Sequence, residues 1–444
     1  MSSPSLAADS LSPSLPAGAG DGGGMRASLR TMLAGAAGNT LEWYDFAAYG
    51  FLAAVFAKNF FPTSDAFVGL ISAFGVFAAS FMMRPIGGIV FGHVGDRYGR
   101  RHALYLSAGL MTLSTVAIGF LPTYEALGAA APVLLLLLRL LQGLSIGGEY
   151  TTSAIFLAEN ARPGRRGIVT SFAAFGATGG TLLGSAAAAL VASLISQEAL
   201  VAWGWRVPFL AGILLGGFVV FLRRSGTAIP EAPREAPSPA RAELPIVGAL
   251  RFDLADIMRG FALSIMLGGG FYLIVVYLTT YMQEIDGLTA RSSLQINTLT
   301  MLLLLVVCPF SAPASDRIGR KPVMVAGLAG LVIFTWPLFA LIDGGDDVEV
   351  LAGQLGLGLL LGLYCGPVPA ALVEMFRPDA RCSAVSLSYN LSMGLAGGTA
   401  PMVAVYLVNR EHYDMGPAAY LIVLAALSLA AALTMKERSR APLR

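Results

Sequence analysis

Apolar segments of about twenty residues recur along almost the whole chain, from about residue 31 to residue 434. A helix needs about 20 predominantly apolar residues to cross the hydrocarbon core of a bilayer, so this recurrence predicts a chain that crosses a membrane many times. The composition agrees, because only 13% of the residues are charged, whereas soluble domains have about 25%. We therefore expect an all-α integral membrane protein with nearly the whole chain embedded.

Twelve segments are long enough to span a bilayer, and they form two groups of six. Their ranges are 33–57, 67–91, 103–122, 132–156, 167–193 and 206–222, then 260–282, 293–313, 323–342, 351–375, 383–408 and 416–435. Between the groups, Arg223–Pro245 is rich in proline and in charges of both signs, which is typical of a polar linker. The predicted organisation is a disordered tail, a six-helix bundle, a cytoplasmic linker, a second six-helix bundle and a short tail, over 1–30, 31–222, 223–258, 259–435 and 436–444.

The tail is rich in Ser, Pro, Gly and Ala and lacks the basic and apolar regions of a signal peptide, so it is expected to be disordered. Met25 begins a segment that would make a plausible start of its own. The sequence therefore leaves the first residue open between Met1 and Met25.

Lysine and arginine are distributed unevenly between the two sides of the membrane. If the N-terminus lies inside, only Lys58, Arg291 and Arg410 of the 29 Lys and Arg residues fall in outer loops, and three more lie within spans or at a span end. Because basic loops stay on the cytoplasmic side, we expect both termini in the cytoplasm, in a bacterial-type inner membrane. The net charge of +2 is too small to indicate nucleic-acid binding.

Short motifs recur at equivalent places in the two groups of spans. GDRYGRR, residues 95–101, follows the second span, and SDRIGRK, residues 315–321, follows the eighth. The loops after spans four and ten repeat a glutamate followed seven residues later by an arginine, in the pairs Glu159 with Arg166 and Glu374 with Arg381. The alternative is that cytoplasmic loops look alike only because they are all rich in basic residues. The orientation of a membrane protein does not require the residue order Asp-Arg-x-Gly-Arg, however, and both loops have it. We therefore interpret the chain as two duplicated bundles.

The stretch NTLEWYDFAAYG, residues 39–50, places two carboxylates inside an apolar span. On a helix Glu42, Asp45 and Tyr49 share one face. Burial and mutual repulsion there favour proton uptake by one carboxylate, and an ionisable group inside a membrane indicates a partner, a cavity or a function. The carboxylates either carry protons or are neutralised by an arginine and hold helices together. They are better proton carriers than the three histidines, which fall in or beside loops at His93, His102 and His412.

The fourth span has a polar face, whose members recur every three or four residues: Arg139, Gln142, Ile146, Glu149 and Ser153. Arg139 and Glu149 are separated by about 15 Å along a helix, so they cannot pair with each other. Each must face a charge on another helix or the substrate. We assign Glu149 to proton coupling, and Arg139 and Gln142 to substrate binding together with Tyr49.

Arg84, in FMMRPIGG, is a second deeply placed cation, followed by a proline and two glycines that would loosen the helix. Its guanidinium would suit a carboxylate-bearing substrate through bidentate hydrogen bonds. The alternatives are that Arg84 pairs with a buried acid or that its side chain extends to the cytoplasmic face.

Other features of the spans indicate packing rather than chemistry. Gly143 and Gly147 would let another helix approach closely. Arg206, beside Trp203 and Trp205, is typical of an interfacial anchor. The cysteines are widely separated and odd in number, so we interpret them as small apolar fillers rather than as disulfides or metal ligands; they are Cys308, Cys365 and Cys382.

The seventh span combines glycines with aromatic and hydroxyl side chains, at Tyr272, Tyr277, Thr279, Thr280 and Tyr281. Tyrosines at a span end usually form an interfacial belt, and that is our first expectation. The alternative is that their aromatic faces help to hold a quaternary ammonium group, and we include Tyr272 among the candidate substrate-binding residues.

GHVGDRYGRR and SDRIGRK resemble the inter-helix signature of the major facilitator superfamily, over the chain from about residue 30. GNTLEWYDFAAYG, FMMRPIGG, RLLQGLSIGGEY and GWRVPF are similar to the metabolite:proton symporter branch, which includes proline/betaine, α-ketoglutarate, citrate and shikimate carriers. The resemblance implies two six-helix bundles that rock around a central site, with uptake driven by protons.

The resemblance also implies that the loop motifs act in gating and make no substrate contact. A motif carboxylate there can meet a helix N-terminus and nearby arginines, a contact favoured by the helix dipole. The gating candidates are Asp96, Arg97, Arg100, Arg101, Asp316, Arg317, Arg320 and Lys321, with Glu159 and Arg166, and Glu374 and Arg381, expected to form companion latches.

We expect a proton-coupled symporter that imports a mono-, di- or tricarboxylate, because three arginines lie at membrane depth. The alternatives are a proline/glycine betaine symporter, an uncoupled facilitator or a sensory receptor. The long charged C-terminal coiled coil of the osmosensing proline/betaine carrier has no counterpart before Arg444. No nucleophile triad, metal cluster or nucleotide loop is recognisable, so an enzyme is not expected. The proton gradient would be the energy source without a cofactor, and the protein would act as a monomer.

Overall fold

The computed structural model describes residues 39–88, 90–91, 100–147, 149–159, 161–162, 164–224, 250–251, 253–377, 381–409, 414–441 and 443. The expected N-terminal tail, both alternatives for its start, most of the central linker and the motif residues Asp96 and Arg97 lie outside these ranges. The side chains of Arg100, Arg101 and Glu149 are also outside the description, although their backbones are helical.

Helices form every regular element of the described residues. In the first half of the chain, they are a helix over 39–51 that continues as α2 (Ala53–Phe60), then α3 (Ala66–Met82), α5 (Arg100–Phe120), α6 (Tyr124–Leu127), α7 (Ala130–Ser145), α8 (Glu149–Glu159), α9 (Arg166–Leu194), α10 (Gln197–Ala199), the π-helical η1 (Leu200–Gly204) and α11 (Arg206–Arg224). We call this part the first half.

The second half continues the same pattern. Its elements are α13 (Leu254–Ile265), the π-helical η2 (Met266–Gly270) and η3 (Tyr272–Tyr277), α14 (Leu278–Glu284), α15 (Ala290–Ile318), α16 (Arg320–Ala340), α17 (Asp347–Cys365), α18 (Val368–Met375), α19 (Arg381–Ser392), the π-helical η4 (Met393–Gly397), α20 (Ala400–Asn409) and α21 (Gly416–Thr434).

Within the described residues, nine helices are long and apolar enough to cross a membrane. A tenth span is bent by 52° between Gln197–Gly204 and Arg206–Phe218. The shorter apolar helix Tyr105–Phe120 and the helix over 39–60 occupy the positions of the third and first expected spans. Each of the twelve expected spans therefore corresponds to a helix, and the prediction of an all-α membrane fold is confirmed.

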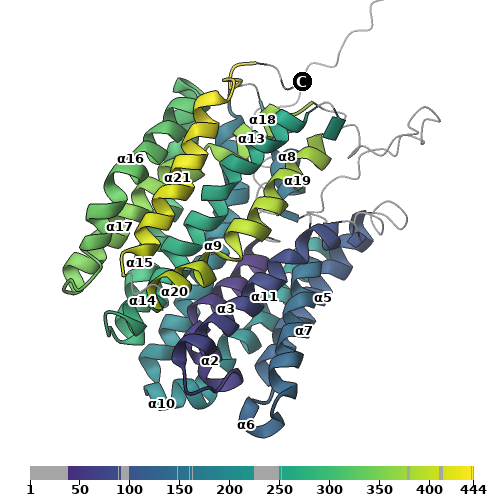
Figure 1. The fold of residues 1–444 in the computed structure, drawn as a ribbon. Coiled ribbons are helices and arrows are strands. Elements are labelled where there is room, and N and C mark those ends of the chain that lie inside the picture. Colours follow the sequence, from purple (N-terminus) through teal and green to yellow (C-terminus); the bar gives the residue numbers. More distant parts are fainter. Residues whose placement is uncertain are drawn as a thin grey trace, which may run out of the picture.

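The two halves pack side by side, with the first half coloured from purple through blue to teal and the second from teal-green to yellow (Figure 1). Helix α9 makes the most extensive contact across them, along α15. Further contacts join α3 to α20 and α8 to α19. Large apolar side chains such as Leu113, Leu214 and Phe310 are exposed on the outside of the bundle, as a lipid-facing surface requires.

The molecule has two ends, which we name by what lies there. The C-terminal segment and the ends of α8, α13, α18 and α19 lie at the top of Figure 1, and we call this end the terminal face. The short helices α6 and α10 lie at the bottom of Figure 1, at the end that we call the opposite face.

Close packing of α3 against α7 depends on the glycines that the sequence singled out. A Cβ atom added to Gly143 would lie 1.8 Å from the carbonyl oxygen of Ser80, and one added to Gly147 would lie 2.0 Å from the amide nitrogen of Gly88. Both distances are far below van der Waals contact. The expected role of Gly143 and Gly147 in close helix approach is confirmed, and it brings Arg84 and Arg139 into one core.

The seventh and eleventh spans both contain π-helical turns, and η2 packs against η4. Such turns frequently mark functional sites. A Cβ added to Gly268 would lie 3.3 Å from the Cα of Gly397, so glycines permit this approach. The π-helical η3 then places Tyr272 and Tyr277 inside the bundle, where only 2% of each residue is exposed.

Candidate functional site

Two buried ion pairs lie in the core of the first half. Asp45 Oδ2 accepts a hydrogen bond from Arg139 Nη1 at 2.7 Å, and both side chains are fully buried. Glu42 Oε1 accepts a hydrogen bond from Arg84 Nη2, and these side chains are 6% and 3% exposed. The pairs explain how four charges persist inside apolar helices, because a buried charge is tolerated when it is paired. Arg84 does not extend to the surface.

The Asp45–Arg139 pair is enclosed by residues of the first half. The Arg139 guanidinium carbon lies 4.6 Å from the ring centre of Phe46 and 4.2 Å from that of Tyr49. Arg139 also donates to Gln142 Oε1 at 2.7 Å. The hydroxyl of Tyr49 donates to the carbonyl of Ala73 at 2.9 Å. The proposed substrate ligands Tyr49 and Gln142 thus surround Arg139 in this state.

The Glu42–Arg84 pair lies beside aromatic side chains from both halves. We call Trp43, Phe81, Tyr150, Tyr272 and Tyr389 the central aromatic cluster, and all five residues are buried. The Arg84 guanidinium carbon lies 5.0 Å from the ring centre of Phe81 and 6.0 Å from that of Tyr389. Arg84 therefore reaches the boundary between the halves.

The central aromatic cluster joins the halves through pairs of nearly parallel rings. Trp43 stacks on Tyr272, with ring centres 6.1 Å apart and an angle of 10° between the planes. Tyr150 stacks on Tyr389, with the corresponding values 4.7 Å and 12°. Phe81 meets Tyr272 edge to face at 5.1 Å. Each contact has one ring from each half, so any rocking of the halves must change all three.

A second group of buried polar side chains joins the second half to the first. Gln354 Nε2 donates to Asn297 Oδ1 at 3.0 Å and to the carbonyl of Ile274 at 3.1 Å. Asn297 Nδ2 in turn donates to Ser185 Oγ of the first half at 3.3 Å. All four residues are buried. These amides can offer neutral hydrogen bonds without adding charge to the centre.

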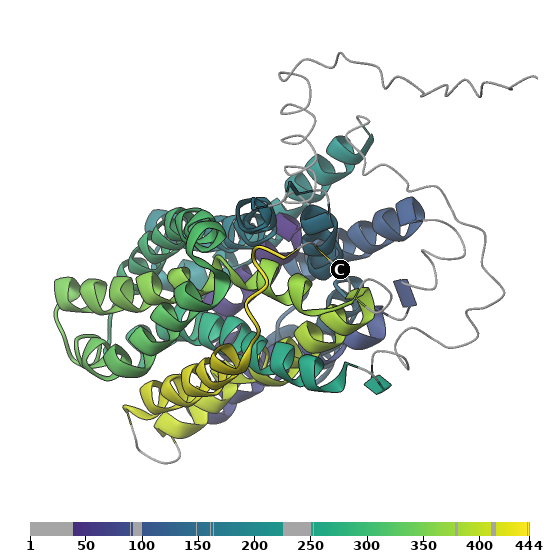
Figure 2. The ribbon, with the colours of Figure 1, turned by 90° about the horizontal axis from the view of Figure 1, so that it is seen from above.

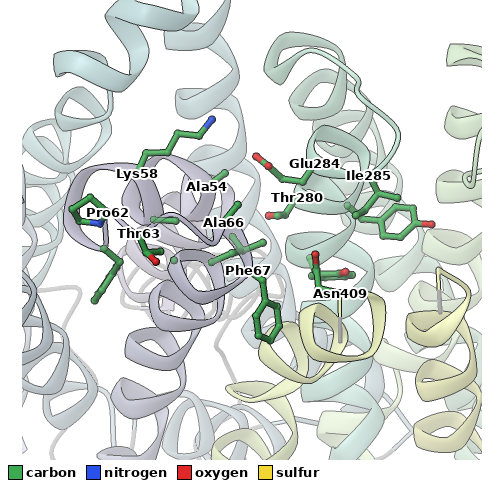
Figure 3. A pocket seen from close by; sticks show the side chains of 16 residues that line it. Ala54, Lys58, Pro62, Thr63, Ala66, Phe67, Thr280, Glu284, Ile285 and Asn409 are labelled. Carbon is green, nitrogen blue, oxygen red and sulfur yellow. The ribbon is translucent and has the colours of Figure 1, made fainter. Parts of the chain in front are cut away.

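A cleft of about 470 Å³ opens between the halves at the opposite face. Lys58 of α2 and Glu284 of α14 lie on its two sides, and Asn409 of α20 completes the lining in the second half (Figure 3). Tyr277 also lines the cleft, and its ring centre lies 6.5 Å from that of Phe74. Successive ring contacts of Tyr277 with Phe74, Phe74 with Phe77, and Phe77 with Tyr272 connect the lining of the cleft to the aromatic cluster.

The terminal face is closed by contacts between the halves. Asp316 accepts hydrogen bonds from the backbone amides of Gly167 at 2.8 Å and Ile168 at 3.0 Å, at the N-terminus of α9. It also pairs with Arg320 at 2.7 Å. A carboxylate at a helix N-terminus is stabilised by the helix dipole, so Asp316 binds the two halves together here.

The companion latches differ from the expected pairs, because their partners are exchanged between the halves. Arg166 Nη1 lies 3.2 Å from Glu374 Oε1, and Arg381 Nη1 lies 2.7 Å from Glu159 Oε1. Pairing within each half, Glu159 with Arg166 and Glu374 with Arg381, was wrong. The reason is helix packing: α9 contacts α18, and α8 contacts α19, across the boundary.

Residues 436–441 extend from α21 across the terminal face, and we call them the C-terminal strap (Figure 2). Glu437 Oε2 accepts a hydrogen bond from the Lys321 amide at 2.8 Å. Arg438 donates to the carbonyl of Met375 at 2.9 Å. Arg166, from the first half, donates to the carbonyl of Ala441 at 2.8 Å. The strap therefore contacts both halves at the end that the latches close.

Two further gating candidates of the second half, Arg317 and Lys321, contact the strap through backbone atoms. Arg440 donates to the carbonyl of Arg317 at 3.1 Å.

Burial of Glu437 alone would raise its pKa, but hydrogen bonds from the Lys321 and Ser439 amides outweigh burial, and the pKa lies below its usual value.

Three tyrosines of the seventh span do not form an interfacial belt. Tyr272, Tyr277 and Tyr281 are each exposed by 2% or less, so the belt expectation was wrong for them. Tyr272 and Tyr277 belong to the π-helical η3, and Tyr281 belongs to α14. Arg206 does lie at a span end, where its guanidinium carbon is 4.4 Å from the ring centre of Trp205.

Sequence analysis missed most of the aromatic cluster. Trp43, Tyr150 and Tyr389 were not among the candidates, although Trp43 adjoins Glu42 and Tyr150 adjoins Glu149. An aromatic residue next to an intramembrane carboxylate was the available signal. Nothing in the sequence indicated that Tyr389, far away in the second half, would stack on Tyr150.

Known proteins match this chain over nearly its full length. Residues 31–235 match the family model described as sugar (and other) transporter, and residues 291–443 match that of the major facilitator superfamily. A putative proline/betaine transporter of Staphylococcus aureus is 34% identical over 400 residues, which are 90% of this chain and 86% of the relative.

Two other relatives have related names. A glycine betaine/proline/ectoine/pipecolic acid transporter of Dickeya dadantii is 34% identical, over 94% of this chain and 84% of the relative. The proline/betaine transporter of Escherichia coli is 32% identical, over 94% and 85%.

Among solved structures, a proton:xylose symporter bound to 6-bromo-6-deoxy-D-glucose has a TM-score of 0.75 at 19% identity, covering 94% of this chain and 98% of the other. At that identity the likeness concerns the fold alone.

Proposed function

This chain belongs to the major facilitator superfamily and is a membrane transporter rather than an enzyme, and from that membership we propose that it is a proton-coupled symporter that imports a small zwitterion of the proline and betaine kind. Its transport would proceed by alternating access. Three relatives that are 32–34% identical over 90–94% of the chain carry the names of proline and betaine transporters, which supports this substrate class.

The charge balance of the core is the observation that carries the proposal. Among the side chains described there, Arg84 and Arg139 are matched by Glu42 and Asp45. A solute with no net charge can enter such a site without leaving a buried charge unmatched, whereas a di- or tricarboxylate would add two or three. The expectation of an organic acid rested on three arginines at membrane depth, and two of them, Arg84 and Arg139, are paired with carboxylates.

Proton coupling is supported by the same two carboxylates. Each is buried, and each is held by an arginine whose partner could change when the carboxylate is protonated. Glu149 remains a third candidate by sequence alone. The energy source would be the proton gradient, and the protein would function as a monomer.

Alternating access is supported by the asymmetry between the two ends. The latches and the C-terminal strap close the terminal face, while the cleft beside Lys58 and Glu284 opens at the opposite face. Because basic loops lie at the terminal face, we assign it to the cytoplasm of a bacterial-type inner membrane. The structure would then be an outward-facing state in which the aromatic cluster is closed.

Uptake into proteoliposomes tests this proposal. Radiolabelled glycine betaine, proline, α-ketoglutarate and citrate would be supplied with and without an inward proton gradient. Gradient-stimulated uptake of betaine or proline is expected. Stimulated uptake of the acids alone would contradict the substrate class, and equilibration of betaine without any gradient effect would identify an uncoupled facilitator.

A further inference from the structure

We propose that Arg84 is the receptor for the substrate carboxylate, that Glu42 and the substrate occupy it in turn, and that the central aromatic cluster holds the substrate ammonium. This inference rests on the proposed function and names the residues of its substrate site. It also gives the two buried ion pairs different roles. Glu42 carries the proton that is linked to the substrate, and Asp45 has a positioning role.

The position of Arg84 distinguishes it from Arg139. Arg84 lies 6.0 Å from the ring centre of Tyr389, which belongs to the second half. The rings over Arg139, those of Phe46 and Tyr49, both belong to the first half. A transported solute must reach the boundary between the halves, since only this boundary opens alternately to the two sides. The Glu42–Arg84 pair is at that boundary, and the Asp45–Arg139 pair is behind it.

The aromatic cluster supplies faces that suit an ammonium group. Tyr389 lies beside Arg84, Tyr150 stacks on Tyr389, and Trp43 meets both Tyr150 and Tyr272. A cation over the face of such a ring is attracted by the ring quadrupole. In the present state the faces of these rings are turned toward each other, with 6.1 Å between the ring centres in one stack and 4.7 Å in the other. Each stack has one ring from each half, so separation of the halves would expose all four faces to the substrate.

Two buried donors add an argument from hydrogen bonding. Trp43 Nε1 and the Tyr389 hydroxyl have no hydrogen-bond partner among the described residues, and the residues are 6% and 1% exposed. Buried donors are nearly always partnered. A carboxylate bound to Arg84, which is next to Tyr389, would provide the missing acceptor.

Exchange on Arg84 links substrate binding to proton uptake. The substrate carboxylate displaces the Glu42 carboxylate from Arg84, and a buried carboxylate that has lost its partner favours the protonated form, because the charged form is costly at low dielectric. When the substrate carboxylate binds Arg84, Glu42 therefore takes a proton on its released carboxylate oxygen. When the substrate leaves, the Glu42 acid gives up this proton and pairs with Arg84 again. One proton then accompanies one zwitterion, and the loaded site carries one positive charge more than the empty site, which is the substrate ammonium over the aromatic faces.

The test compares variants of the full chain in proteoliposomes. For Glu42→Gln, gradient-driven accumulation of glycine betaine should be lost, while betaine exchange down its own gradient should persist and become insensitive to pH. For Asp45→Asn, the correctly folded fraction should retain pH-dependent exchange. Accumulation that survives in Glu42→Gln, or uncoupling caused by Asp45→Asn alone, would overturn the assignment.

The aromatic part is tested by ligand preference, which a merely structural role would not change. Tyr272→Leu should weaken betaine exchange about tenfold, whereas Tyr272→Phe should keep the ring and the affinity. Tyr406→Phe, at an exposed tyrosine, is the matched control. Choline, which has the ammonium without the carboxylate, should not compete. Competition by choline as strong as that by betaine would overturn the role of Arg84.

Wild-type protein provides a measurement that needs no variant. Betaine binding in detergent should take up protons from a weakly buffered solution, and betaine binding without proton uptake would overturn the exchange. If wild-type proteoliposomes transport betaine but Glu42→Gln remains coupled, only this inference is wrong. If wild-type protein transports no zwitterion, the proposed function itself is wrong.

Discussion

Arg166 and Glu374 lie 208 positions apart in the chain, yet they form a buried ion pair that joins the two halves at the terminal face. In the equivalent pair the arginine comes from the second half, Arg381, and the glutamate from the first half, Glu159. Each of these two ion pairs joins one half to the other, so the pairs can form only while this face is closed. The latches therefore report the conformational state directly.

Asp316→Asn is predicted to open the terminal face more often. The carboxylate accepts hydrogen bonds from the Gly167 and Ile168 amides, and an amide side chain would lose the favourable charge at the N-terminus of α9, about 0.3–1 kcal/mol or more when partly buried. Hydrogen exchange at these two amides should become faster. Asp347→Asn, at an exposed site on the opposite face, is the control, and equal exchange in both variants would contradict the latch.

Glu437→Gln is predicted to loosen the C-terminal strap. The contact with the Lys321 amide is exposed to solvent, so the loss should be about 0.5–1 kcal/mol and should appear as faster exchange of that amide. Because hydrogen bonds lower the pKa of Glu437, the wild-type contact is present at neutral pH and weakens as pH falls below the usual carboxylate range. Lys436→Gln should leave the exchange unchanged. A pH-independent Lys321 amide would contradict this account.

Asp45→Asn is predicted to destabilise the first half, because it leaves Arg139 buried without its counter-charge. Breaking a fully buried pair costs about 3–5 kcal/mol, which thermal denaturation in detergent would detect. Adding Arg139→Gln should recover much of the loss. Asp256→Asn breaks a partly exposed pair with Arg259 and should cost about 0–1 kcal/mol. An equal loss in these two single variants would contradict the buried role of Asp45.

Gly143→Ala is predicted to separate α3 from α7, since the new Cβ would lie 1.8 Å from the Ser80 carbonyl oxygen. Overpacking of this kind costs about 1–3 kcal/mol. Gly109→Ala in α5 is the matched control, because nothing lies within 4 Å of its Cβ, and alanine there should be neutral or slightly stabilising. A normal denaturation midpoint for Gly143→Ala would contradict the close approach.

Asp286, in the loop between α14 and α15, is predicted to make the opposite face sensitive to pH. Burial raises the pKa of Asp286 to about 6, and the charges of Asp343 and Asp414 add to the effect. The folded state therefore binds the proton more tightly than the unfolded state, so stability should fall as pH rises from about 4 to about 6. Asp286→Asn should remove this part of the pH profile, and an unchanged profile would contradict it.

The sequence was sufficient for the fold because the span signal is local. Each apolar run and its flanking polar residues can be recognised without knowing its neighbours, and all twelve positions hold a helix. The same is true of Gly143 and Gly147, whose spacing alone indicates close packing. Arg139 was expected to face either a charge on another helix or the substrate, because geometry excluded Glu149, and in the structure it pairs with Asp45.

The partners across the molecule could not be predicted in the same way. Which glutamate meets Arg166 depends on how α9 packs on α18, and the sequence favoured the near neighbour Glu159. The inward rotation of Tyr272 depends on the π-helical η3, for which no sequence pattern was evident. The organic-acid expectation rested on the number of arginines at membrane depth, and the sequence could not show that Arg84 and Arg139 each pair with a carboxylate.

The most direct test of the central claim is to measure proton movement together with the solute. Proteoliposomes would hold the full-length protein and a luminal pH indicator, with no proton gradient at the start, and unlabelled glycine betaine would be added outside. A coupled symporter should acidify the lumen as betaine enters, and Glu42→Gln should admit betaine without acidification. Betaine entry into wild-type vesicles with no change in luminal pH would contradict the account.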